Sequence, residues 1–251
     1  MIVVNLFGGP GCGKSTGAAY IFARLKERGV KVELVTEFAK DLTWDKSEGL
    51  ADQVYVFGNQ FHRLYRCARA GVQVVVTDSP LLLSLVYRRP NEGPFGDEFA
   101  AYVRTCHRHF ANLNFLITRW KPYEQTGRIE TKEEAKVRDQ SITDLLEAEL
   151  PSEFTRVDGL VPGYDTIVEA VARNLEMAKI RKEKTRNELE QEDAHAGVGE
   201  GNVRRQDQGF AEGRAVETQG KGHAYGRRTE EAQARQLRAP RQERLREGEM
   251  T

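Results

Sequence analysis

Residues 8–15 place glycine, lysine and serine at the spacing G-x-x-x-x-G-K-[ST], the pattern of a phosphate-binding loop, between an apolar run and a helical pattern. The glycines let backbone N–H groups face phosphate oxygens, Lys14 can reach the β- and γ-phosphates, and the Ser15 hydroxyl can bind Mg²⁺. The expected ATP-binding residues are Gly8, Gly9, Pro10, Gly11, Cys12, Gly13, Lys14, Ser15 and Thr16. The alternative is a glycine-rich turn that binds nothing, but the lysine and serine in register favour a nucleoside triphosphate.

Two carboxylates follow the second and third strands that the sequence predicts. Glu37 comes directly after residues 31–36, and Asp78 comes directly after residues 71–77. Ligands of parallel sheets collect at the carboxyl ends of the strands, where one carboxylate can hold Mg²⁺ and another can accept a proton from an attacking hydroxyl. We therefore expect Asp78 to lie near the metal and Glu37 to act as the base. The alternative for Glu37 is a helix-capping or salt-bridging carboxylate.

A possible acceptor site lies on the helix predicted for residues 50–70. Apolar residues recur there every three or four positions, so one face should pack on the sheet. The opposite face carries Gln60 and Arg63, and this face could overlook the acceptor. Gln60 could then bind the edge of a base through its amide, and Arg63 could bind a phosphate or a base carbonyl. The alternative is an ordinary solvated helix face.

The polar stretch 119–130 is predicted to be a lid over the carboxyl ends of the strands. It is basic, with Arg119, Lys121 and Arg128, and it follows the fourth predicted strand. Phosphoryl transfer requires positive charge around the equatorial oxygens and exclusion of water, and a closing basic loop supplies both. Arg128 is our first choice for an arginine that stabilises the transition state, and Arg119 is the second. The alternative is a solvated basic loop without a catalytic role.

The elements that must position these residues alternate between strand and helix patterns. Strands are predicted at 2–7, 31–36, 71–77, 113–118 and 153–157, and helices at 15–28, 50–70, 80–87, 95–110, 131–150 and 164–184. Thr131 and Glu134 are spaced as a capping box at the start of the fifth of these helices, 131–150. This order predicts an α/β fold in which about five parallel strands lie between two helix layers, the three-layer sandwich of P-loop NTPases.

The chain changes in composition near residue 185. Residues 1–184 carry the strand and helix patterns, whereas 185–251 are rich in Glu, Arg, Gln and Gly with few apolar residues. Such a segment buries too little apolar surface to offset its ordering entropy, so we expect a kinase-type domain followed by a disordered tail. The arginines near the end of the tail could contact nucleic acid, but glutamates lie between them, and a solvated tail is the favoured interpretation.

The whole-chain composition excludes several classes of protein. The 38 basic and 38 acidic side chains balance, so no global basic field indicates a nucleic-acid partner. The three cysteines, Cys12, Cys67 and Cys106, have no paired spacing, which favours reduced thiols. No apolar stretch approaches the roughly twenty residues that span a bilayer, and the first predicted strand leaves no room for a signal peptide. We therefore expect a soluble cytoplasmic protein without a membrane partner.

Four segments together resemble a bacteriophage family of small P-loop kinase-like proteins, often described as AAA-type ATPases and related to the nicotinamide riboside kinase domain. The segments are 7–16, 34–41, 77–83 and 127–135, and the resemblance covers about residues 1–180. The family includes kinases that act on 5-hydroxymethyl-deoxyuridine in phage DNA. The resemblance implies ATP and Mg²⁺, an alcohol acceptor and, for a phage-encoded protein, the host cytoplasm.

The arrangement also resembles that of deoxynucleoside kinases, in which a glutamate after the second strand is the base and a glutamine on a long helix reads the nucleobase. Glu37 and Gln60 occupy comparable positions, although Ser79-Pro80 follows Asp78 where those kinases have an arginine beside the acidic residue. The leading hypothesis is a kinase for the hydroxymethyl group of 5-hydroxymethyluracil in DNA. One alternative is a kinase for a free nucleoside, nucleotide or nicotinamide riboside. Another is an ATPase that acts as a switch or remodeller.

Overall fold

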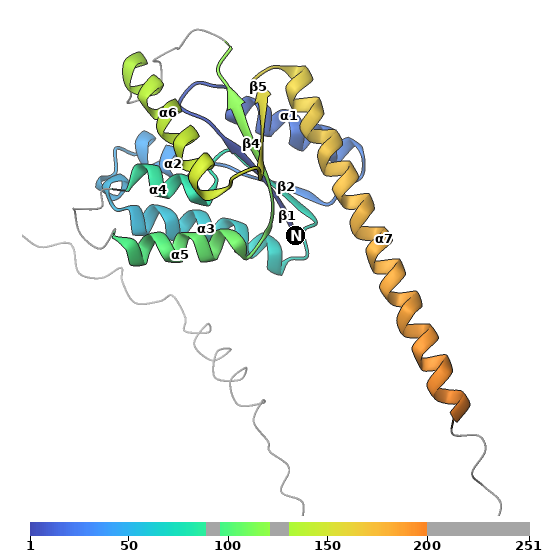
Figure 1. Ribbon diagram of the computed structural model, residues 1–251. Coiled ribbons are helices and arrows are strands. Elements are labelled where there is room, and N and C mark those ends of the chain that lie inside the picture. Colours follow the sequence, from blue (N-terminus) through green and yellow to red (C-terminus); the bar gives the residue numbers. More distant parts are fainter. Residues whose placement is uncertain (89–95, 121–130, 200–251) are drawn as a thin grey trace, which may run out of the picture. The chain divides into compact units, whose positions relative to one another are not determined.

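The computed structural model describes residues 1–88, 96–120 and 131–199, and its centre is a five-stranded parallel sheet (Figure 1). The strand order is β2-β3-β1-β4-β5, and every neighbouring pair is parallel. The strands are β1 (Ile2–Phe7), β2 (Val32–Val35), β3 (Val74–Thr77), β4 (Ala111–Thr118) and β5 (Phe154–Asp158). This arrangement confirms the α/β fold with five parallel strands.

Seven α-helices and two short 3₁₀ helices lie between or after the strands within these described ranges. They are α1 (Lys14–Glu27), α2 (Phe38–Trp44), η1 (Glu48–Ala51), α3 (Gln53–Arg69), η2 (Leu81–Leu83), α4 (Ser84–Tyr87), α5 (Asp97–Arg108), α6 (Lys132–Glu149) and α7 (Val161–Gly199). Helix α6 begins at the expected capping box, because Thr131 Oγ1 accepts from the Glu134 N–H and Glu134 Oε2 accepts from the Thr131 N–H. No described helix is long and apolar enough to cross a membrane.

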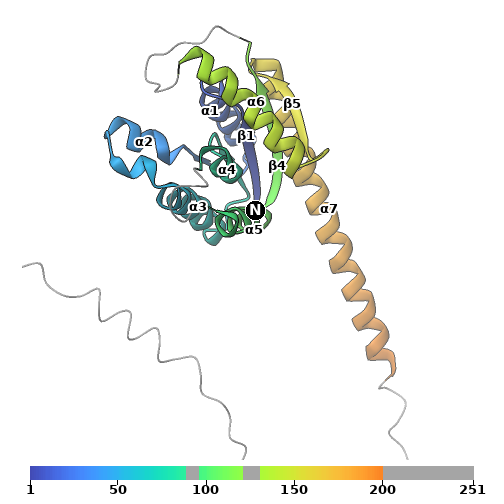
Figure 2. The same ribbon diagram turned by 60° about the vertical axis from the view of Figure 1, so that its left-hand side comes forward.

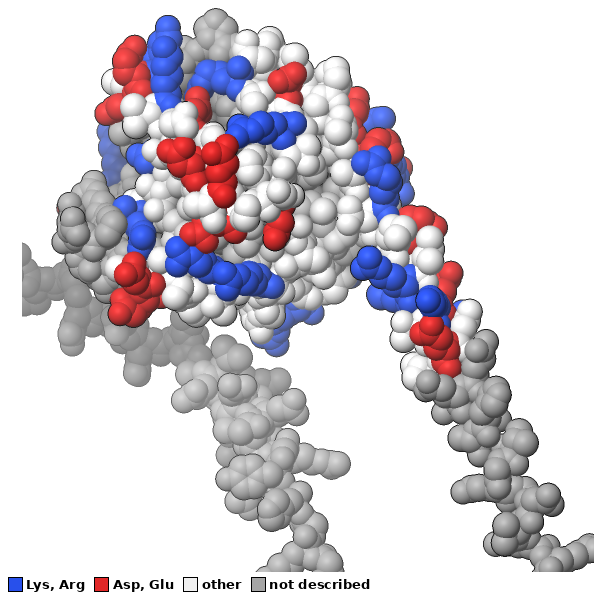
Figure 3. Space-filling view, viewed as in Figure 1, with Lys and Arg blue, Asp and Glu red and all other residues white. Residues whose placement is uncertain are grey.

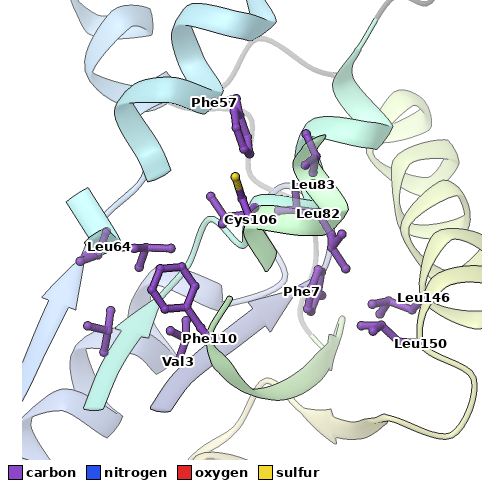
Figure 4. Packing of buried hydrophobic residues seen from close by; sticks show 14 of the residues in the cluster. Val3, Phe7, Phe57, Leu64, Leu82, Leu83, Cys106, Phe110, Leu146 and Leu150 are labelled. Atoms are coloured by element: carbon purple, nitrogen blue, oxygen red, sulfur yellow. The ribbon is translucent and has the colours of Figure 1, made fainter. Parts of the chain in front are cut away.

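Two hydrophobic clusters lie on opposite faces of the sheet, which confirms the three-layer sandwich. Successive residues of β1 point to opposite faces, so Val3 belongs to one cluster and Val4 to the other. The first cluster packs the sheet against α3, η2, α5 and α6 (Figure 4), and the second packs it against α1 and α7. In Figure 2, β1 and β4 accordingly separate α2 and α3 from α7.

The structure differs from the expected elements mainly at α2 and α7. Helix α2 lies in a segment for which no helix was expected. Helix α7 was expected to end near Lys184 but continues to Gly199, and the disorder expected for the tail stays a prediction. Residues 176–190 of α7 are rich in good helix formers, and pairs such as Glu176–Lys179 and Lys184–Glu188 add support of a few tenths of a kcal/mol each. The rest of the expected disordered tail, 200–251, lies outside the described residues.

The contacts of the chain divide it into two units. The first is Met1–His195, which contains the sheet and nearly all of the described helices. The second is Ala196–Thr251, of which only the last residues of α7 are described. The predicted domain boundary after residue 184 therefore falls within the described part of α7, and it stays a prediction.

Candidate functional site

The predicted phosphate-binding loop connects the carboxyl end of β1 to the first turn of α1. Gly13 precedes α1 with φ of 107°, a conformation that side chains other than glycine rarely adopt. Cys12 is buried, whereas Ser15 and Thr16 are exposed at the start of the helix. The Lys14 ammonium donates to the carbonyl oxygens of Gly8 and Gly9 at 2.7 and 3.0 Å. The loop thus brings a lysine, a hydroxyl and a helix N-terminus together.

Asp78 lies directly beside this loop because β3 pairs with β1. Thr77, the last residue of β3, is in register with Asn5, so Asp78 follows the strand next to the end of β1. Its side chain is buried, and its Oδ1 has no hydrogen-bond partner among the described residues. A buried carboxylate oxygen without a partner is costly, so it indicates a site for a cation or donor group. The residues present therefore fit a Mg²⁺ ion held by Asp78 and Ser15.

Glu37 lies at the end of β2 and immediately precedes α2. It occupies the N-cap position of this helix, but its side chain makes no capping hydrogen bond. The structure therefore does not show the helix-capping role that was one alternative for Glu37. Helix α2 was not expected, and it turns the chain away from the sheet just after this carboxylate.

The pKa of Lys14 reports the charges that surround it. Burial of the ammonium acts to lower this pKa, but electrostatic interactions with Cys12, Glu37, Tyr87 and Asp78 together outweigh burial and raise it. Glu37 and Asp78 thus act on the same lysine from the ends of two different strands. The two predicted carboxylates and the predicted lysine form one electrostatic cluster.

Gln60 and Arg63 lie on the side of α3 that faces α2 and the end of β3. Gln60 is buried, and its amide contacts the Phe38 N–H and the Thr77 hydroxyl. Arg63 contacts the Thr36 carbonyl and the Asp41 carboxylate. The face of α3 that carries Gln60 and Arg63 is therefore partly packed inside the protein. The two expectations for this face were that it is solvated or that it overlooks the acceptor. Substrate binding by these two residues stays a prediction.

On the other side of the loop, Arg119 follows β4 and pairs with Asp139 on α6. Arg119 Nε and Nη2 donate to Asp139 Oδ2 at 3.0 and 2.9 Å, and Asp139 Oδ1 accepts from the Gly9 N–H at 3.0 Å. The loop is thereby connected to both elements that flank the predicted lid. Lys121 and Arg128 lie outside the described residues. Sequence reasoning missed Asp139, since a lone aspartate in a charged helix gives no signal.

Tyr164 on α7 is a second residue that sequence reasoning missed. Its hydroxyl lies 3.0 Å from the carbonyl oxygens of both Gly13 and Gly159, so it ties the phosphate-binding loop to the turn after β5. Its ring also fills the space beside Gly17, where a Cβ would come within 2.4 Å of the ring. Gly17, an isolated glycine inside α1, was the signal in the sequence that something packs closely there.

Comparison with known proteins places this geometry in a family. A search of curated proteins gave no match. A family model described as AAA domain matches residues 3–162, which include β1 to β5, the phosphate-binding loop, Glu37 and Asp78. The chain therefore belongs to this AAA domain family, a family of the P-loop NTPase type.

Proposed function

We propose that this chain is an ATP-dependent kinase that transfers the γ-phosphoryl group to an alcohol. The observation that carries the proposal is the placement of Glu37 and Asp78 just after the neighbouring strands β2 and β3, beside the loop that carries Lys14, with Asp78 Oδ1 buried and without a hydrogen-bond partner among the described residues. A kinase must hold the metal–nucleotide complex and take a proton from the hydroxyl of its acceptor, whereas a hydrolytic ATPase performs the same two tasks with water as the nucleophile. Two carboxylates from neighbouring strands can divide these two tasks.

The residues have separate roles in this proposal. Lys14 and the N–H groups of the loop bind the triphosphate, and Asp78 with Ser15 holds Mg²⁺, which neutralises charge on the phosphate oxygens when it is bound. Glu37 accepts the proton of the acceptor hydroxyl while the oxygen of that hydroxyl bonds to the γ-phosphorus. The bond from this phosphorus to the oxygen of ADP breaks, and ADP leaves. Arg128 is proposed to stabilise the transferring phosphoryl group, with Arg119 and Lys121 as further lid residues.

The proposed acceptor is the hydroxymethyl group of 5-hydroxymethyluracil in DNA, and it rests on the family resemblance. Such a base must leave the duplex stack to reach the loop, at a cost of a few kcal/mol. DNA binding normally recruits many Lys and Arg contacts, yet the described basic and acidic side chains are interspersed on the face in Figure 3. This charge pattern favours the second candidate, a free nucleoside, nucleotide or nicotinamide riboside.

The test is transfer of γ-labelled phosphate from ATP to a panel of acceptors. The panel contains 5-hydroxymethyluracil DNA, thymine DNA, free nucleosides and nucleotides, and nicotinamide riboside. We expect label on the modified DNA alone, and label on a small acceptor instead would identify a metabolite kinase. Release of ADP without any labelled acceptor would contradict the kinase proposal and support an ATPase that acts as a switch.

The role of Glu37 has its own test. Glu37→Gln should lower transfer by roughly 10²- to 10⁴-fold, because the amide cannot take the proton, while ATP affinity stays the same. Glu33→Gln on the same strand is the matched control, since Glu33 is exposed and pairs with Lys26. Transfer by Glu37→Gln at the level of the control would exclude Glu37 as the base.

A further inference from the structure

Gln60 connects the two carboxylate-bearing strand ends through a single side chain. Its Oε1 accepts from the Phe38 N–H at 3.0 Å, and its Nε2 lies 3.4 Å from Thr77 Oγ1. Phe38 follows Glu37 in the chain, and Thr77 precedes Asp78. Thr77 Oγ1 also accepts from the Ser79 N–H at 3.1 Å, so the backbone on both sides of Asp78 is held at this hydroxyl.

Arg63 lies one helical turn after Gln60 and holds the same segment from its other side. Its Nη1 donates to the Thr36 carbonyl at 3.2 Å, and its Nη2 donates to Asp41 Oδ2 at 2.6 Å. Its guanidinium carbon also lies 5.0 Å from the centre of the Phe38 ring. Arg63 therefore holds the peptide before Glu37, a carboxylate on α2 and an aromatic ring next to Glu37.

We propose that Gln60 and Arg63 are positioning residues that fix the Glu37 carboxylate relative to Asp78. The inference rests on the proposed role of Glu37 as the base. Arg63 holds the carbonyl group before Glu37 and Gln60 holds the N–H group after it, so the direction of the Glu37 side chain is set from both sides. The Gln60 amide is buried with both of its ends in use inside the protein. It does not read the acceptor base, and the specificity for the acceptor comes from other residues.

Thr77 offers a test that direct contact with the acceptor cannot imitate, because its side chain is fully buried. Thr77→Val keeps the shape but removes the hydroxyl, whereas Thr77→Ser keeps the hydroxyl. We expect Thr77→Val to lower kcat for transfer by roughly tenfold to a hundredfold, the loss typical of a base displaced by about 1 Å. The KM values for ATP and for 5-hydroxymethyluracil DNA should change by less than about threefold, as for an interaction that acts on the chemical step. Thr77→Ser should retain nearly full activity.

Gln60→Met tests the central contact and has a matched control. Gln73 Oε1 accepts from the Lys31 N–H at 3.1 Å, which is the same kind of bond at the amino end of β3. Gln60→Met should lower kcat as Thr77→Val does, whereas Gln73→Met should not. Together, Gln60→Met and Thr77→Val should lower kcat by less than the product of the single effects, because they break one connection. A raised KM for the acceptor with unchanged kcat would instead make Gln60 a substrate-reading residue and overturn the proposal.

A readout that needs no acceptor is hydrogen exchange of the Phe38 amide, followed by NMR in the full chain. Gln60→Met should raise its exchange rate by at least about tenfold, and Gln73→Met should leave it unchanged. Unchanged exchange in Gln60→Met would overturn the proposal even if activity fell. If Glu37→Gln retains full transfer, the proposed base fails. If Glu37→Gln loses transfer while Gln60→Met and Thr77→Val keep kcat, only the positioning role fails.

Discussion

Two regions of the same sheet treat buried polar groups in opposite ways. At the carboxyl end, Asp78 Oδ1 is buried without a hydrogen-bond partner among the described residues, and Lys14 donates to carbonyl oxygens of its own loop. Where β1 meets the first half of β4, by contrast, buried and half-buried amides bond to one another. Asn5 Nδ2 donates to Asn112 Oδ1 at 2.9 Å and to Asn114 Oδ1 at 3.0 Å. The first arrangement leaves bonding capacity for a ligand, and the second uses it for the fold.

The charged groups follow the same division. On the amino side, Arg104 makes a bidentate contact with Glu149 at 2.7 to 3.0 Å, which lowers the pKa of that carboxyl. On the carboxyl side, two carboxylates, Glu37 and Asp78, are among the groups that raise the pKa of one lysine against the effect of its burial. A one-to-one pair of opposite charges uses its bonding capacity within the fold, whereas two carboxylates near one lysine leave negative charge that can bind a cation. The difference indicates that the carboxyl end exchanges stability for function.

The largest expected effect that separates the two regions is that of Asp78→Asn. The neutral amide loses the negative charge proposed to hold Mg²⁺, so transfer should fall by roughly 10²- to 10³-fold. The free energy of unfolding should stay the same or rise by about 1 kcal/mol, because a buried anionic oxygen without a partner is removed. Transfer at varied Mg²⁺ concentration and urea unfolding measure the two quantities.

The control for this variant is Asp158→Asn. Asp158 also ends a strand, but it is exposed and accepts a hydrogen bond from the Thr118 hydroxyl at 2.7 Å. Transfer should remain near the wild-type level in this control. A loss of stability in Asp78→Asn of more than about 2 kcal/mol would mean that Asp78 serves the fold, and the contrast between the two regions would fail.

The contrast also explains which parts of the site could be predicted from the sequence. The phosphate-binding loop, Glu37 and Asp78 each follow a strand directly, and parallel strands bring their carboxyl ends together, so local patterns were sufficient to find this cluster. The five parallel strands and the capping box of α6 followed from local patterns too. The apolar periodicity of α3 did not predict that Gln60 is buried, because a polar residue at this position of the helix could equally face solvent.

Other features depend on contacts that no local pattern encodes. Asp139 lies 130 residues from Gly9, and the Tyr164 hydroxyl bonds to a carbonyl 151 residues away. The extension of α7 was missed for a different reason. Its residues favour a helix individually, whereas the expected end near Lys184 was chosen because the apolar residues become sparse there.

The second test concerns His107, a buried histidine on the amino side. Burial, reinforced by the positive charge of Arg108, lowers its pKa to about 4. In the unfolded chain the pKa is near 6.5, so below this value the unfolded state binds the proton more readily. The contribution of neutral His107 to the free energy of unfolding should be fully present above about pH 6.5. The free energy of unfolding should fall by about 3 kcal/mol as the pH decreases to 4.

Urea unfolding between pH 4 and 7 measures this dependence, and two variants isolate the group responsible. His107→Gln should remove this part of the slope, and His109→Gln, at an exposed position, should keep it. An unchanged slope in His107→Gln would show that another group carries the acid sensitivity of the fold.

The smallest expected effect is that of Asn114→Leu, and it reverses the pattern of Asp78→Asn. Leucine has nearly the same size but cannot accept from Asn5 or donate to the Glu153 carbonyl, so the free energy of unfolding should fall by about 2 kcal/mol. Phosphoryl transfer at a temperature where the chain stays folded should be unchanged, because the amide network has its partners inside the fold. Asn174→Leu on the exposed side of α7 should change stability by less than about 0.5 kcal/mol. A variant that kept its stability and lost transfer would place Asn114 in the functional site, and polar satisfaction would no longer distinguish the two regions of the sheet.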